Sequence, residues 1–64
     1  MPIIRVEMLK GRSVEQKKAL VESLTSGFVE SCGGNRDNIQ VVITEIESEN
    51  WGIGAELLSD KSKH

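Results

Sequence analysis

The segment Ile39–Ile46 most constrains the fold, because its residues predict a strand that is apolar on both faces. Such a strand needs cover on each side. The chain has only 64 residues, however, and a chain of that length buries only about 60% of the surface that its unfolded state exposes. So short a chain has few other helices or strands that could pack against the two faces of this strand.

A first strand and a long helix precede this segment. Residues Ile3–Leu9 alternate as a strand does, and one face would carry Pro2, Ile4, Val6 and Met8. The other face would carry Ile3, Arg5, Glu7 and Leu9.

The helix is expected from Val14 to Cys32. Residues 10–12 predict a turn, and Ser13 then begins a capping box in which Gln16 reaches back to the cap. A glycine pair at 33–34 is typical of a helix end. Apolar residues at helical spacing predict the buried face: Leu20, Val21, Leu24, Phe28 and Cys32.

The order of strand, helix and strand predicts a right-handed crossover with two parallel strands. A polar loop at 35–38 joins the helix to the second strand, and residues 47–50 turn the chain. Residues 51–58 predict a short carboxyl-terminal hairpin or arm, and residues 61–64 predict a frayed tail. The fold class is therefore α+β, a β-α-β unit with residues 1–64 in a single domain.

One helix can cover only one face of a two-stranded sheet. The second face of Ile39–Ile46 must then be buried against other chains, since two strands alone are only marginally stable in water. We expect a closed symmetric oligomer.

Composition narrows the class of function. A net charge of −2 with mixed signs argues against nucleic-acid binding, which needs a basic patch. One cysteine and one histidine exclude an internal disulfide and a His/Cys metal cluster. Neither an apolar run long enough to span a membrane nor a targeting segment is visible, so we expect a soluble cytoplasmic protein.

Pro2 is a candidate for a chemical role because initiator methionine is usually removed before a small residue. Removal would leave Pro2 with a free secondary amine, and α-amino groups titrate near ~8 in water. Burial or nearby cations would favour the neutral amine, which is a usable general base. If Met1 is retained, the same nitrogen is an amide without basicity. The structural alternative is that proline simply starts an edge strand.

Other residues also have two interpretations. Arg12 is either a solvated charge in a turn, or a residue whose guanidinium binds a carboxylate through two parallel hydrogen bonds. Trp51 is either a core or interface residue or the wall of a dry pocket. Residues Glu45, Glu47 and Glu49 alternate and either form a solvated edge or supply an acid–base pair. Cys32 is interpreted as a small core residue.

Together these residues resemble a known family. Met-Pro-Ile-Ile, Leu9-Lys10-Gly11-Arg12-Ser13, Val42-Ile43-Thr44-Glu45 and Trp51-Gly52-Ile53-Gly54 occur in the order seen in the 4-oxalocrotonate tautomerase family of the tautomerase superfamily. The resemblance extends over essentially the whole chain.

The resemblance implies a β-α-β subunit in a homohexamer, and a cofactor-independent isomerase. The substrate would be 2-hydroxymuconate or a similar enol of a 2-oxo acid, a type of compound formed in aromatic hydrocarbon catabolism. Pro2 would move a proton between the enol oxygen and a distal carbon, Arg12 would bind the far carboxylate, and Trp51 would form the apolar wall.

Gln40 departs from the family pattern, which has a second arginine there, supplied by another subunit. Glutamine brings no charge to stabilise a developing enolate. Arg36 and Arg5 are alternative sources of that charge. Three hypotheses follow for the chain: a tautomerase with a modified substrate, one subunit of a hetero-oligomer, or a non-enzymatic relative.

Overall fold

The computed structural model describes residues 2–61. Met1 and residues 62–64, which belong to the expected frayed tail, lie outside the described residues. Strand β1 (Ile3–Leu9) leads into helix α1 (Val14–Cys32), the short 3-10 turn η1 (Arg36–Asn38) and strand β2 (Gln40–Ile46). The elements that follow form the carboxyl-terminal arm: η2 (Ser48–Asn50), β3 (Gly52–Ile53), β4 (Glu56–Leu57) and α2 (Leu58–Lys61).

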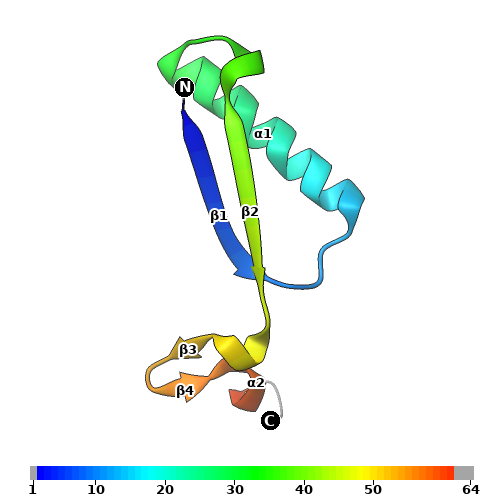
Figure 1. The fold of residues 1–64 in the computed structure, drawn as a ribbon, viewed down its shortest axis with the longest axis vertical. Helices are drawn as coiled ribbons and strands as arrows, with labels where there is room; N and C mark the ends of the chain where they lie inside the picture. The colour runs from blue at the N-terminus through cyan, green and yellow to red at the C-terminus, as the bar shows by residue number, and fades with distance from the viewer. Residues whose placement is uncertain (1, 62–64) are drawn as a thin grey trace.

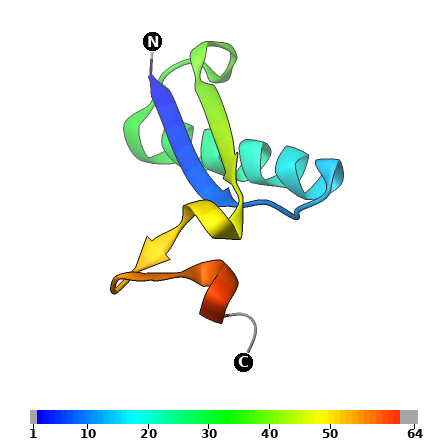
Figure 2. The ribbon, with the colours of Figure 1, turned by 60° about the horizontal axis from the view of Figure 1, so that its bottom comes forward.

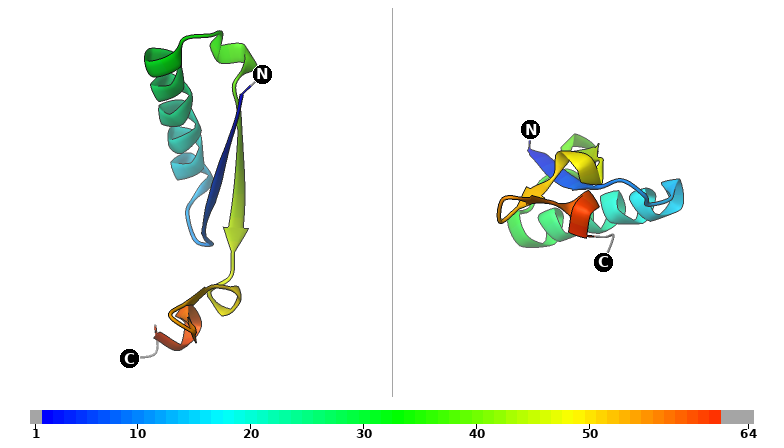
Figure 3. Two further views of the ribbon diagram at one scale, coloured as in Figure 1. Left: turned by 90° about the vertical axis from the view of Figure 1, so that its left-hand side faces the viewer. Right: turned by 90° about the horizontal axis from the view of Figure 1, so that it is seen from below.

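Strands β1 and β2 pair in parallel, with Ile3 opposite Gln40 and Leu9 opposite Ile46. Helix α1 lies against one face of this sheet, and Figure 3 shows the opposite face without a covering layer. The predicted β-α-β arrangement and α+β class are confirmed, and β2 begins one residue later than expected.

The capping box at the start of α1 forms as predicted. Ser13 Oγ accepts a hydrogen bond from the Gln16 backbone N–H at 3.1 Å, and the Ser13 N–H donates to Gln16 Oε1 at 2.9 Å. These two bonds satisfy backbone donors that a helix start otherwise leaves free. The helix therefore begins at a defined residue directly after the turn that contains Arg12.

The buried face of α1 was only partly predicted. Leu20, Leu24 and Phe28 are half-buried, but Val21 is 36% exposed and Cys32 is also exposed. The prediction of Cys32 as a core residue is therefore wrong for the single chain. The most enclosed residue of the helix is Thr25, so the face that meets the sheet is rotated relative to the apolar stripe.

The carboxyl-terminal arm forms the predicted hairpin. Strands β3 and β4 pair antiparallel around Gly54 and Ala55, which both have positive φ, at 60° and 68°. Two consecutive residues of this kind match the turn that suits the twist of a two-residue hairpin loop. The arm extends beyond the carboxyl-terminal ends of β1 and β2, away from the chain's N-terminus (Figures 1 and 2).

The described part of the chain has no buried hydrophobic residue. Ile3 on β1 is 50% exposed, Val42 on β2 is 41% exposed, and Ile53 in the arm is 51% exposed. Ile3 and Val42 lie on the sheet face that α1 leaves open. The outer face of β2 is more polar than predicted, because Gln40 and Thr44 alternate with Val42 there.

None of the helices within residues 2–61 has the length and apolar character needed to cross a bilayer.

Candidate active site

Pro2 and Gln40 lie together at the amino-terminal end of the sheet. The Gln40 backbone N–H donates to the Pro2 carbonyl oxygen at 3.1 Å, one step beyond the pairing of Ile3 with Gln40. Pro2 is half-buried, whereas Gln40 is exposed. Strand pairing therefore holds the Pro2 main chain in place, so its nitrogen would have a defined position beside the start of β2.

Arg12 lies at the other end of β1, in the turn before α1. Gly11 has a φ of +137°, a conformation that side-chain-bearing residues rarely adopt, and it lets the chain reverse there. Arg12 Nη1 donates to the Leu9 carbonyl oxygen at 3.1 Å, and the residue is exposed. One nitrogen of the guanidinium thus fixes the side chain, and further N–H groups face solvent, available to an anion.

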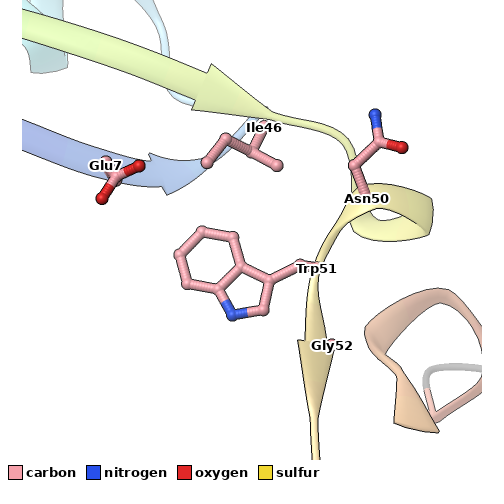
Figure 4. Close-up of a pocket in the computed structure, with 5 residues that line it drawn as sticks. All are labelled: Glu7, Ile46, Asn50, Trp51 and Gly52. Atoms are coloured by element: carbon pink, nitrogen blue, oxygen red, sulfur yellow. The ribbon is translucent and has the colours of Figure 1, made fainter. Parts of the chain in front are cut away.

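Trp51 forms the wall of a pocket beyond the same end of the sheet. The pocket has a volume of about 260 Å³ and is lined by Glu7, Ile46, Asn50, Trp51 and Gly52 (Figure 4). The Trp51 carbonyl oxygen accepts a 2.8 Å hydrogen bond from the Leu58 N–H, which ties the pocket wall to the arm. The indole and Ile46 give the pocket an apolar part.

Glu7 is a pocket residue that sequence reasoning missed. It comes from β1 and lies on the open face of the sheet, at the register position of Thr44. The strand alternation placed Glu7 on that face, but no pattern in the sequence indicated that residues 50–52 would turn back toward it. The pocket therefore combines an apolar wall with one carboxylate.

The structure separates the predicted site residues into two groups. Pro2 and Gln40 lie at the amino-terminal end of the sheet, while Arg12 and Trp51 lie beyond its carboxyl-terminal end. The seven residues of β1 separate the two groups. At about 3.3 Å per residue, this distance exceeds roughly 20 Å, far more than a six-carbon acid can span. One chain therefore does not bring the four residues to one small substrate.

The alternating carboxylates do not form an acid–base pair. Glu45 Oε1 accepts a 2.6 Å hydrogen bond from Lys17 Nζ on α1, whereas Glu47 Oε1 accepts a 3.0 Å bond from Lys10. The Lys17 hydrogen bond is the main cause that lowers the pKa of Glu45, and the Glu47 hydrogen bond raises the pKa of Lys10. Glu49 belongs to η2, so the three carboxylates are not on one strand. Glu45 and Glu47 thus each have a lysine as structural partner.

No group of three or more His, Cys, Asp or Glu side chains within residues 2–61 is arranged to hold a metal ion.

Comparison with known proteins decides the family. The model of the family described as "Tautomerase enzyme" matches residues 2–61. The chain belongs to the tautomerase family. This membership confirms the resemblance drawn from the turn at residues 11–13 and the residues around Trp51, and it identifies the chain as an enzyme with tautomerase activity.

Two curated relatives and two solved structures illustrate the similarity of this tautomerase to known proteins. A probable tautomerase of Bacillus cereus is 44% identical over 61 residues, covering 95% of this chain and 100% of the relative. A 2-hydroxymuconate tautomerase of Comamonas testosteroni is 47% identical over 53 residues, covering 83% and 84%.

Among solved structures, a 4-oxalocrotonate tautomerase homologue of the tomaymycin biosynthetic pathway has a TM-score of 0.95. It is 32% identical, with 98% of this chain and 97% of that chain covered. Another homologue of 4-oxalocrotonate tautomerase is 37% identical with a TM-score of 0.89, covering 92% and 97%. The β-α-β fold with its short arm is therefore the fold of this enzyme family.

Proposed function

We propose that this tautomerase converts an enol of a 2-oxo acid, such as 2-hydroxymuconate, into its conjugated keto form, with Pro2 as the general base. The observation that carries the proposal is the position of Pro2. Within a tautomerase chain, it directly precedes β1 and is held beside Gln40, whose backbone N–H donates to the Pro2 carbonyl oxygen. The similarity to 2-hydroxymuconate tautomerases of Comamonas testosteroni and Pseudomonas putida supports 2-hydroxymuconate as the type of substrate.

The reaction moves one proton and changes no oxidation state. After removal of Met1, the neutral Pro2 nitrogen accepts the enol O–H proton. The electron pair of that bond forms the carbonyl, and the displaced double bond shifts along the conjugated chain. The distal carbon then takes the proton back from the Pro2 ammonium, so the base is regenerated.

Arg12 and Trp51 have binding roles in this proposal. Arg12 has guanidinium N–H groups beyond the one bonded to Leu9, and these suit a carboxylate at the far end of a diacid. Trp51 and Ile46 give the pocket an apolar surface, against which we propose that the conjugated carbon chain packs. A less polar environment keeps the Pro2 amine neutral, because burial disfavours the charged form.

The proposal requires more than one copy of the chain. Pro2 and Arg12 are separated by the length of β1 within one chain, so a site that uses both must combine the amino-terminal end of one sheet with the carboxyl-terminal end of another. The absence of buried hydrophobic residues among residues 2–61 supports the same arrangement. We propose a homohexamer as the form in which these ends meet.

Of the three hypotheses that Gln40 raised, family membership favours an enzyme over a non-enzymatic relative. A hetero-oligomer, in which a paralogous chain supplies the charge, is distinguished by testing the purified chain alone.

The test combines intact-mass measurement with an absorbance assay on 2-hydroxymuconate. Purified protein that has lost Met1 should be active, and a preparation shown by mass to retain Met1 in full should be inactive because its Pro2 nitrogen is an amide. Activity in the fully retained form would rule out Pro2 as the base. Inactivity of the trimmed homo-oligomer, followed by activity after mixing with a paralogous chain, would indicate a hetero-oligomer.

A further inference from the structure

Arg5 lies on the open face of the sheet, near the end that holds Pro2 and Gln40. In the parallel register Ile3 is opposite Gln40, and Arg5 is opposite Val42. Ile3, Arg5, Gln40 and Val42 are all exposed and alternate with half-buried residues, so they share the face that α1 does not cover. Arg5 and Gln40 are diagonal neighbours on adjacent strands, with Cα atoms about 8 Å apart from the strand spacing and rise.

Arg5 has no structural partner among the described residues, whereas the other candidate does. The Arg5 side chain makes no hydrogen bond or ion pair within residues 2–61. Arg36 Nη2 instead donates to both carboxylate oxygens of Glu22 at 2.8 Å, and its Nη1 donates to Ser26 Oγ at 3.1 Å. Arg36 is thus committed to fastening η1 to α1.

The charge distribution on the open face leaves one source of positive charge. Arg5 is the only cationic residue that β1 and β2 place on this face, and Glu7, two positions further along β1, is the only anionic one. Gln40 lies beside Pro2, and its side-chain amide can donate hydrogen bonds but has no charge. A guanidinium on a long stem can turn along the strand toward Gln40 while its methylene groups rest on Val42.

We propose that Arg5 binds the 2-oxo acid end of the substrate and supplies the positive charge that Gln40 lacks. This inference rests on the proposed function of Pro2, because the enol oxygen that loses its proton becomes more negative in the transition state. A fixed guanidinium near that oxygen and its neighbouring carboxylate stabilises the developing charge. Residue 40 then contributes a neutral amide hydrogen bond, and the cation comes from the adjacent strand.

The experiment moves the charge from one strand to the other. Four proteins are compared: the wild type, Arg5→Gln, Gln40→Arg and the double variant with both changes. The matched control is Lys18→Gln, which removes the same charge from the exposed side of α1. Each protein is titrated by calorimetry with 2-oxoadipate, a saturated six-carbon 2-oxo diacid, and assayed on 2-hydroxymuconate. Oligomer mass is measured by light scattering.

Arg5→Gln should weaken 2-oxoadipate binding and lower kcat/KM by roughly ten- to hundredfold, the usual effect of losing a charge-assisted hydrogen bond. The double variant should regain most of both losses, and Lys18→Gln should match the wild type. Oligomer mass should be the same in every protein. Arg5→Lys should regain only part of the activity, since an ammonium lacks the planar fork.

Two results would overturn the inference while leaving the proposed function intact. In the first, Arg5→Gln binds and turns over substrate as the wild type does. In the second, Arg5→Gln loses oligomer mass and the double variant does not recover, which would mean that Arg5 pairs with a carboxylate such as Glu7 of another copy. If the wild type without Met1 has no turnover, alone or mixed with a paralogous chain, the proposed function fails, and the calorimetric comparison still decides whether Arg5 binds the acid.

Discussion

The two ends of the β1–β2 sheet carry different halves of the proposed chemistry. The amino-terminal end has Pro2, the proposed general base, beside the neutral Gln40. The carboxyl-terminal end has Arg12, which can hold a carboxylate, and the apolar pocket of Trp51. The difference teaches that the groups of the proposed site are separated by the length of β1 in a single chain, so the proposal depends on assembly.

The same two ends are fastened to α1 by different ion pairs. Near the carboxyl-terminal end, Lys17 and Glu45 join the first turns of α1 to β2 at 2.6 Å. Near the amino-terminal end, Arg36 joins η1 to Glu22 at 2.8 Å, just before β2 begins. Each ion pair thus positions the backbone next to one group of site residues, and neither pair contains a proposed site residue.

The largest effect is expected for Pro2→Ala, which tests the amino-terminal end. The variant has a primary amine of different basicity on a less constrained chain end. We expect turnover on 2-hydroxymuconate to fall by about 10²–10⁴-fold, with a smaller change in KM. Steady-state kinetics on the trimmed protein measures this. Wild-type turnover in the variant would remove Pro2 from the mechanism.

Arg12→Ala tests the carboxyl-terminal end and should act mainly on binding. We expect KM for the diacid 2-hydroxymuconate to rise about ten- to hundredfold, because a charge-assisted hydrogen bond is lost. The monoacid phenylenolpyruvate lacks the far carboxylate and should be affected little. Equal losses on both substrates would assign Arg12 a structural role, through its bond to the Leu9 carbonyl oxygen.

Gln40→Arg adds charge at the amino-terminal end and should have a smaller effect. If Arg5 already supplies a cation there, the rate on 2-hydroxymuconate should rise less than about tenfold in the wild-type background. The added charge should also move the apparent pKa of the catalytic base downward, since a nearby cation disfavours the protonated amine. The pH–rate profile measures both effects. A gain of several orders of magnitude would show that the wild type lacks a second cation.

The smallest effect concerns the ion pair of Glu45 with Lys17. The pKa of Glu45 is lowered in the folded chain. The pair therefore stabilises the fold at a pH above the ordinary pKa of a glutamate carboxyl group. This contribution is lost as the pH falls through the pKa of the folded state. The melting temperature of Glu45→Gln should therefore depend less on pH below about 5 than that of the wild type. Glu49→Gln is the matched control. Identical pH profiles for wild type and Glu45→Gln would contradict the role of this pair.

The sequence predicted which residues form the helix and the strands better than it predicted which side of each is buried. The capping box at Ser13 and the parallel strands follow from local patterns, and both are confirmed. The stripe on α1 was partly wrong because Lys17 and Thr25 turn toward the sheet, while Val21 and Cys32 turn outward. Period-two alternation could have placed Glu45 beneath the helix, but only the structure shows Lys17 as its partner.

The candidate site was predictable as a set of residue types and not as a geometry. The resemblance to the tautomerase family indicated Pro2, Arg12, Gln40 and Trp51, and their placement at two ends follows from the order and register of the strands. Glu7 was missed because the return of residues 50–52 toward β1 depends on the η2 turn. Likewise, no pattern distinguished Arg36 from Arg5, since the contact of Arg36 with Glu22 depends on the geometry of the loop that contains η1.

The most direct test of a site shared between copies is complementation between Pro2→Ala and Arg12→Ala. Each variant alone should be weakly active on 2-hydroxymuconate. When the two are unfolded together and reassembled, some sites combine Pro2 from one chain with Arg12 from the other. Random mixing of two chains should restore about a quarter of wild-type turnover, with oligomer mass unchanged. If each site lies within a single chain, the mixture will show only the average of the two variants, and the account of two separate ends brought together by assembly is wrong.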